Sequence, residues 1–99
     1  MRGVSMMSKI LVVDDEADFR GIITEYLSFA GFDYVEANDG EEALAHLNQE
    51  AFDLVVLDIM MPKIDGITVL KEIRKKWDIP VILLTARGEE YDKLFGFDA

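Results

Sequence analysis

Three stretches of the chain are continuously apolar, and a fourth is mixed. The apolar stretches are residues 10–13, 54–57 and 81–84, a composition typical of strands that are buried on both faces of a parallel sheet. Residues 34–37 carry a glutamate in their middle and therefore suit an edge strand better than a central one. The hydrophobic pattern thus predicts four strands.

Apolar residues recur at steps of three and four after the first predicted strand, which indicates a helix. This helix is expected over residues 16–30, and Gly31 follows it as a left-handed stop. The residues expected on its inner face are Phe19, Ile22, Ile23, Tyr26, Leu27 and Ala30.

A capping signal predicts a second helix. Asp39 is followed three residues later by Glu42, which resembles a capping box at a helix start. The helix that follows is expected to bury Ala43, Leu44 and Leu47.

Two more helices follow from the spacing of apolar residues. The third is expected to run from Asp65 or Gly66 to Trp77, because Pro80 prevents its continuation. Its inner face is expected to contain Ile67, Leu70 and Ile73. The fourth is expected to start near Gly88 and to contain Tyr91, Leu94 and Phe95. Strands and helices therefore alternate, which predicts an α/β fold with a doubly wound parallel sheet and helices on both faces.

Composition and charge narrow the class of protein. The chain has 99 residues, of which 51% are hydrophobic, and this suffices for one globular domain. Its formal net charge of −10 disfavours direct binding of nucleic acid or of an anionic membrane. The lack of cysteine excludes disulfides and thiolate metal sites. Residues 1–8 lack the apolar run of a signal peptide, so we expect a loose N-terminal extension and a cytoplasmic location.

Acidic residues follow two of the predicted strands. Asp14, Asp15 and Glu16 come directly after the first strand, and Asp58 comes directly after the third. In open parallel sheets ligands bind beyond the carboxyl ends of the strands, so the three aspartates are expected to share one crevice. Each close pair of carboxylates there would cost on the order of 4 kcal/mol at an effective dielectric constant near 20. Oxygen ligands without histidine or cysteine favour Mg²⁺, or Mn²⁺, as the cation that relieves this repulsion.

A simpler interpretation of these acids is structural. Asp14, Asp15 and Glu16 could cap the following helix, and Asp58 alone could be an ordinary turn residue. Capping gives no reason for a second acid opposite the first loop, so the joint placement favours a shared site.

The motifs around the acids resemble the receiver domain of bacterial two-component response regulators. They read ILVVDDE at residues 10–16, LVVLDIMMP at residues 54–62 with DG at 65–66, and PVILLTA at residues 80–86. The resemblance covers residues 9–99, which it identifies as one receiver domain. It implies a flavodoxin-like sheet of strand order 2-1-3-4-5.

By this resemblance, Asp58 accepts a phosphoryl group from a phosphohistidine of a sensor histidine kinase. Asp14, Asp15, Asp58 and the backbone carbonyl of Met60 would hold Mg²⁺. The hydroxyl of Thr85 would turn toward the phosphoryl group as the switch residue. The chain would then be a phosphoacceptor with slow self-dephosphorylation, and not an enzyme.

The resemblance also implies two kinds of partner. In the family the first helix contacts the kinase, so Asp18 and Arg20 are candidates for kinase docking. The segment from Leu84 to Gly88 is similar to regulators that control transcription through a DNA-binding output domain, which would lie outside these residues.

The chain departs from the family pattern after its fourth strand. The family continues into a fifth strand and a fifth helix, and that strand ends in a lysine that contacts the phosphoryl group. We expect this unit to be missing here, so that residues 81–84 form an exposed edge and the chain self-associates through it. The alternative function is then a receiver-like interaction module that cannot signal, because the lysine is absent.

Two other classes of protein share parts of this pattern. A flavodoxin-like cofactor binder needs a phosphate-binding loop after the first strand, where Asp14, Asp15 and Glu16 would repel a phosphate. A phosphatase with an aspartate nucleophile needs that nucleophile after the first strand and a second acid two residues later, followed by a threonine. Residue 16 is a glutamate and no threonine follows it, so both classes are disfavoured.

Overall fold

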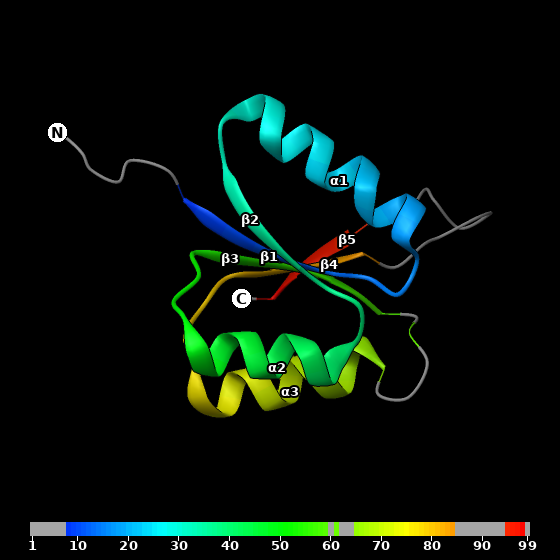
Figure 1. Ribbon diagram of the computed structural model, residues 1–99. Helices are drawn as coiled ribbons and strands as arrows, with labels where there is room; N and C mark the ends of the chain where they lie inside the picture. The colour runs from blue at the N-terminus through cyan, green and yellow to red at the C-terminus, as the bar shows by residue number, and fades with distance from the viewer. Residues whose placement is uncertain (1–7, 60, 62–64, 85–94, 99) are drawn as a thin grey trace, which may run out of the picture.

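The structure, a computed structural model, describes residues 8–59, 61, 65–84 and 95–98. In these residues five strands and three helices follow one another along the chain (Figure 1). They are β1 (Lys9–Val13), α1 (Ala17–Ala30), β2 (Asp33–Ala37), α2 (Gly40–Gln49), β3 (Leu54–Asp58), α3 (Gly66–Lys76), β4 (Val81–Leu84) and β5 (Phe95–Asp98). Helix α1 covers one face of the sheet, and α2 and α3 cover the other.

The first four strands confirm the predicted parallel sheet. They are arranged in the order β2-β1-β3-β4, with β2 at an edge as its charged centre indicated. The last residue of β1, Val13, lies opposite Ala37 of β2 and Leu57 of β3. The carboxyl ends of three neighbouring strands are therefore level, and the residues that follow them meet at one end of the sheet.

The fifth strand differs from the sequence prediction. β5 pairs with β4 in the antiparallel direction, and Leu84 lies opposite Phe95. Unlike a parallel neighbour, an antiparallel one needs no crossover helix between the two strands. The predicted exposed edge at β4 is therefore wrong, and the expectation of self-association through that edge loses its basis. Phe95 was expected in a fourth helix and instead begins β5, while the rest of that helix lies outside the described residues.

The hydrophobic core is larger on one face of the sheet than on the other. Successive strand residues point to opposite faces, so each central strand contributes to both sides. On the α1 side the buried residues are Ile10, Val12 and Val56, which pack against Ile23 and Leu27. On the α2 and α3 side they are Leu11, Val13, Ala37, Ala43, Leu47, Phe52, Val55, Leu57, Met61, Val69, Ile73 and Val81. Among the described residues, twelve buried core residues thus lie on the face covered by α2 and α3, and three lie on the face covered by α1.

The predicted helix ends are confirmed. Gly31 ends α1 with a φ of +91°, a conformation that glycine adopts without steric cost. Asp39 is the N-cap residue of α2, and its side chain accepts a hydrogen bond from the backbone N–H of Glu42 at 2.9 Å. Asp65 caps α3 in the same way, with the N–H of Thr68 as donor at 2.9 Å. A local glycine therefore fixes the end of α1, and local aspartates fix the starts of α2 and α3.

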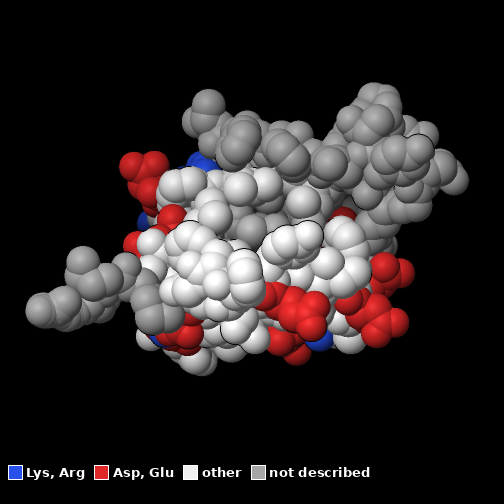
Figure 2. Space-filling view, turned by 90° about the horizontal axis from the view of Figure 1, so that it is seen from above, with Lys and Arg blue, Asp and Glu red and all other residues white. Residues whose placement is uncertain are grey.

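The predicted inner faces of α1 and α3 are only partly correct. Ile22, Tyr26 and Ala30 of α1 are exposed, because this helix touches the sheet mainly through Ile23 and Leu27. Tyr26 is 73% exposed. Figure 2, which views the molecule from the side of α1, shows a broad uncharged area with acidic side chains at its border.

The predicted inner face of α3 is right at Ile73, which is buried, and at Leu70, which packs against the core. Val69 and Ile73 are its buried apolar residues, whereas Ile67 is exposed. Among the described residues, no helix is long and apolar enough to cross a membrane.

Candidate functional site

Three aspartates meet at the carboxyl ends of β1 and β3. Asp14 follows β1 directly, Asp15 is the next residue, and Asp58 is the last residue of β3. One carboxylate oxygen from each of the three residues lies within 4.8 Å of those from the other two. Asp14 and Asp58 are fully buried, and Asp15 is half-buried. The structure thus brings together the three acids that the sequence placed in one crevice, and we call them the acid trio.

The strand register explains why Asp14 and Asp58 are neighbours. Val13 lies opposite Leu57, so the next residue of each strand reaches the same end of the sheet. The backbone N–H of Asp14 donates to the carbonyl of Ala37 at 3.1 Å, which continues the pairing of β1 with β2. The backbone on which each buried acid stands is therefore held by the sheet itself.

The loop after β1, residues 14–16, turns sharply and is called the acid loop below. The backbone N–H of Glu16 donates to Oδ1 of Asp14 at 2.8 Å, which closes the turn. Glu16 is the N-cap residue of α1, and its side chain makes no capping hydrogen bond. The simpler interpretation, in which these acids serve to cap α1, therefore does not account for Glu16.

Gly66 lets the start of α3 approach the end of β3 very closely. Its backbone N–H donates to the carbonyl of Ile59 at 2.8 Å. A Cβ atom at this position would lie 2.5 Å from the backbone oxygen of Asp58 and 2.5 Å from Cα of Ile59. Only glycine fits there without moving the backbone that carries Asp58. The sequence showed the Asp-Gly pair as a helix start, but a contact with β3 leaves no trace in residue spacing.

Arg20 has a different environment from the one expected. The sequence offered it as an exposed residue for kinase docking, yet its side chain is only 14% exposed. Its Nε donates to Oε1 of Glu36 at 2.7 Å, and its Nη1 donates to Oδ1 of Asn38 at 3.2 Å. Nη1 also donates to the backbone carbonyl of Asp14. Because Glu36 and Asn38 are 16 and 18 positions away, no local pattern could have revealed these contacts.

The chemistry of the acid trio fits a hard divalent cation. All its side-chain donors are carboxylate oxygens, the ligands that Mg²⁺ and Mn²⁺ prefer. Carboxylates this close repel one another, and a bound cation would offset this cost. The predicted metal contact of Met60 and the predicted switch residue Thr85 lie outside the described residues.

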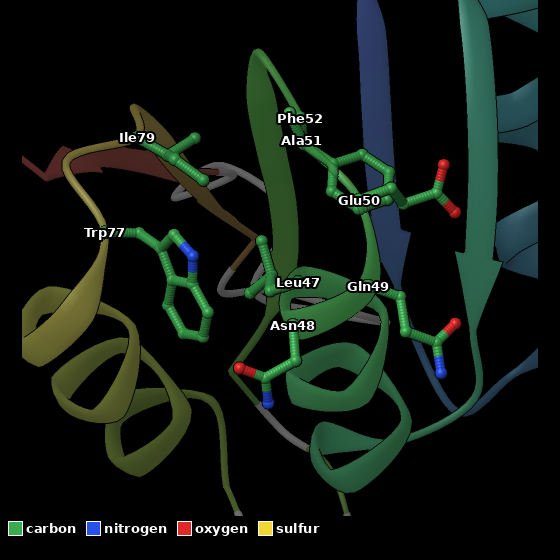
Figure 3. Close-up of a pocket in the computed structure, with 8 residues that line it drawn as sticks. All are labelled: Leu47, Asn48, Gln49, Glu50, Ala51, Phe52, Trp77 and Ile79. Carbon is green, nitrogen blue, oxygen red and sulfur yellow. The ribbon is translucent and has the colours of Figure 1, made fainter.

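A hollow of about 460 Å³ lies at the opposite end of the sheet, between the ends of α2 and α3 (Figure 3). Trp77 and Ile79 lie on one side of it and face Leu47, and the polar ends of Gln49 and Glu50 point away from them. The residues that line it are Leu47, Asn48, Gln49, Glu50, Ala51, Phe52, Trp77 and Ile79.

The acid in this lining has a partner. Glu50 forms an ion pair with Lys9, and this hydrogen bond raises the pKa of the lysine. Most of the residues that line the hollow are apolar, and Glu50 is the one acid among them. The hollow thus differs from the acid trio at the other end of the sheet.

The fold and the acid trio together define a flavodoxin-like α/β domain with an acidic cluster at the carboxyl ends of its strands. The family model of the response regulator receiver domain matches residues 10–99, and the chain belongs to this family.

Two curated relatives are similar to this chain in sequence. A transcriptional regulatory protein CpxR homolog of Haemophilus influenzae is 50% identical over 92 residues, which is 93% of this chain and 40% of that protein. A probable transcriptional regulator ycf27 of Guillardia theta is 52% identical over 90 residues, 91% of this chain and 35% of that protein. The chain thus spans less than half the length of these relatives.

Two solved structures are similar in fold and sequence. The response regulator TrrA of Thermotoga maritima, in complex with Mg²⁺-BeF, matches with a TM-score of 0.78 and 48% identity over 86% of this chain and 74% of that chain. A complex of TrrA with the histidine kinase ThkA matches with a TM-score of 0.77 and 49% identity over 81% of this chain and 70% of that chain.

Proposed function

We propose that this chain is a phosphoacceptor receiver domain of a two-component response regulator and that Asp58 accepts the phosphoryl group. The observation that carries the proposal is the acid trio. Asp58 is fully buried at the end of a central strand, and its carboxylate lies in one cluster with those of Asp14 and Asp15. Membership of the receiver family supports the same assignment.

The reaction is a phosphoryl transfer from a phosphohistidine to a carboxylate. A carboxylate oxygen of Asp58 attacks phosphorus, a new O–P bond forms, and the P–N bond to the donor histidine breaks. The electron pair of the broken bond returns to the imidazole, which takes up a proton. The product is an acyl phosphate on Asp58.

The remaining residues of the site hold a cation and orient the acceptor. Asp14, Asp15 and Asp58 would hold Mg²⁺, or Mn²⁺, with the backbone carbonyl of Met60 as a further ligand. When bound, Mg²⁺ offsets the negative charge that builds on the transferring group. The Mg²⁺-BeF complex of TrrA supports Mg²⁺ as the cation. Thr85 would act as the switch, turning its hydroxyl toward the phosphoryl group.

The proposed chain is a phosphoacceptor and not an enzyme, because the phosphoryl group ends on the protein itself. Slow self-dephosphorylation by water would return it to the starting state.

A sensor histidine kinase is the proposed donor, and a transcriptional output domain is the proposed target. The complex of TrrA with the kinase ThkA supports the donor. Relatives named as transcriptional regulators, of which this chain matches less than half, support an output domain that binds DNA. The charge of −10 on this chain argues against a direct contact with DNA. Such a pathway would operate in the cytoplasm.

Labelling with acetyl phosphate in the presence of Mg²⁺ tests the proposal. Wild-type chain is expected to gain one phosphoryl group by intact-protein mass spectrometry, and Asp58→Asn is expected to gain none. Asp78→Asn is the matched control, because Asp78 is an exposed aspartate between α3 and β4. Labelling of Asp58→Asn, or no labelling of the wild type, would contradict the proposal.

A further inference from the structure

One side chain connects the acid loop to the edge of the sheet. The guanidinium of Arg20 contacts the backbone of Asp14, the carboxylate of Glu36 at the end of β2, and the amide oxygen of Asn38 just after β2. We propose that Arg20 is a positioning residue that holds the acid loop in the shape in which Asp14 and Asp15 share a cation with Asp58. This inference rests on the proposed function of the acid trio.

Arg20 holds the acid loop at both of its ends. Its backbone N–H donates to the carbonyl of Glu16 at 2.9 Å, the first hydrogen bond of α1. Its side chain returns to the carbonyl of Asp14 at the start of the same loop. A single residue therefore sets the distance between the end of β1 and the first turn of α1.

The contact with the Asp14 carbonyl has a direct effect on Asp15. That carbonyl belongs to the peptide group that links Asp14 to Asp15, and a peptide group is planar. A hydrogen bond that fixes the carbonyl oxygen of Asp14 therefore also fixes the orientation of the peptide plane that leads into Asp15. The side chain of Asp14 is held separately, by the N–H of Glu16 at 2.8 Å. Both metal-binding carboxylates of the loop thus depend on a backbone that Arg20 restrains.

The shape of the guanidinium matters as well as its charge. Nε and Nη1 point in different directions in one plane and donate to Glu36 and to the Asp14 carbonyl at the same time. A lysine carries one ammonium group on a flexible stem and does not reproduce this fork. Glu36 balances the charge of Arg20, so the arginine acts by geometry and is not a counter-ion reserved for the acid trio.

Direct measurement of Mg²⁺ binding by calorimetry tests the inference. Arg20→Lys is expected to raise the Kd for Mg²⁺ about tenfold, at the low end of what contacts behind metal ligands contribute. In the metal-free protein, hydrogen exchange at the Glu16 amide is expected to become faster, because its acceptor on Asp14 is less restrained. Lys75→Gln is the matched control, since the Lys75–Glu72 pair lies on an exposed face of α3, and it should change neither quantity.

The dependence of labelling on Mg²⁺ separates positioning from catalysis. With acetyl phosphate as donor, Arg20→Lys should need more Mg²⁺ but reach the wild-type rate at saturation. Glu36→Ala should also need more Mg²⁺ for labelling, by a smaller factor than Arg20→Lys. Circular dichroism shows whether each variant folds, and Glu36→Ala provides the test if Arg20→Lys does not fold. A lower rate at saturating Mg²⁺ with an unchanged Kd would overturn the inference, because Arg20 would then act on the chemical step.

The two proposals fail in different ways. If the wild type binds Mg²⁺ and is labelled, but Arg20→Lys and Glu36→Ala match it in Kd and in Glu16 exchange, the positioning role is wrong and the phosphoacceptor function stands. If the wild type neither binds Mg²⁺ nor accepts a phosphoryl group, the proposed function itself is wrong, and the positioning role falls with it.

Discussion

The two ends of the parallel sheet have opposite physical characters. At the carboxyl end, three carboxylates lie within 4.8 Å of one another, and two of them are fully buried. At the amino end, the hollow between α2 and α3 is lined mainly by apolar side chains such as Leu47, Phe52 and Trp77. The same strands therefore carry a charged cluster at one end and an apolar contact at the other.

This difference shows how the domain tolerates an unfavourable site. Close carboxylates repel each other, and burial makes the repulsion stronger. The apolar layer between the sheet and the two helices supplies the opposing stabilisation. We therefore expect changes at the amino end to alter stability without altering the site, and changes at the carboxyl end to alter both.

The largest expected effect is at the amino end. Leu47→Ala should lower the free energy of unfolding by about 3 kcal/mol, because it removes a buried side chain beside an existing hollow. The Kd of the folded protein for Mg²⁺ should stay unchanged. Urea unfolding and calorimetry measure the two quantities. Ile67→Ala is the control, since Ile67 is exposed and should cost much less. A changed Kd in Leu47→Ala would mean that the two ends are coupled.

Mg²⁺ itself should stabilise the carboxyl end. At a concentration about 100 times its Kd, a ligand that binds only the folded state adds about 2.7 kcal/mol of stability. We expect this gain in the wild type and a much smaller one in Asp58→Asn, which lacks one of the three carboxylates. Thermal unfolding with Mg²⁺ and with a chelator provides the comparison. An equal gain in both proteins would place the cation elsewhere.

Gly66→Ala should affect stability and the site together. The added methyl group would lie 2.5 Å from the backbone oxygen of Asp58, so either α3 or the end of β3 must move. We expect a loss of about 2 kcal/mol and weaker binding of Mg²⁺. Gly21→Ala is the matched control, because a Cβ atom there meets nothing within 4 Å and alanine favours the helix. Unchanged binding in Gly66→Ala would show that the close approach serves stability alone.

The smallest expected effect is a pH dependence at the start of α3. The hydrogen bond from the backbone N–H of Thr68 lowers the pKa of Asp65 below its ordinary value of 3.8. Because the folded pKa is the lower one, the cap stabilises the fold fully above 3.8 and loses this effect as pH falls through the folded value.

Asp65→Asn isolates this contribution. The amide oxygen can still accept from Thr68 but does not titrate in this range. The difference in Tm between wild type and Asp65→Asn should therefore be constant near neutral pH and should shift against the wild type in acid. A difference that stays constant down to acid pH would show that Asp65 does not couple the cap to protonation.

The sequence predicted those features that depend on residues close together in the chain. Continuous apolar runs predicted β1, β3 and β4. The cap at Asp39 is an interaction over three residues, and the Asp-Gly pair at 65–66 marked the start of α3. The acid trio was also predictable, because parallel strands align their carboxyl ends. The contacts of Arg20 and Gly66 could not be predicted, because each residue touches another segment of the chain and the sequence carries no signal of that contact.

Two of the errors arise from contacts with distant parts of the chain. Helical periodicity shows which residues of a helix are apolar, but the number of neighbouring helices decides how many of them are covered. Helix α1 is the only described helix on its face of the sheet, so Tyr26 and its neighbour Ile22 remain exposed. Likewise, the apolar pattern of residues 81–84 predicted a strand without showing that β5 would pair with it in the antiparallel direction.

The position of Trp77 has a consequence for spectroscopy. It is the single tryptophan of the chain, and it lies half-buried at the end of α3, on the hollow and away from the acid trio. Its fluorescence emission should therefore shift when the layer of α2 and α3 separates from the sheet, and should respond little to the cation. A tryptophan substituted for Phe52 or Ile79 would report on the same hollow. An optical signal from the acid loop would therefore require a tryptophan introduced within that loop.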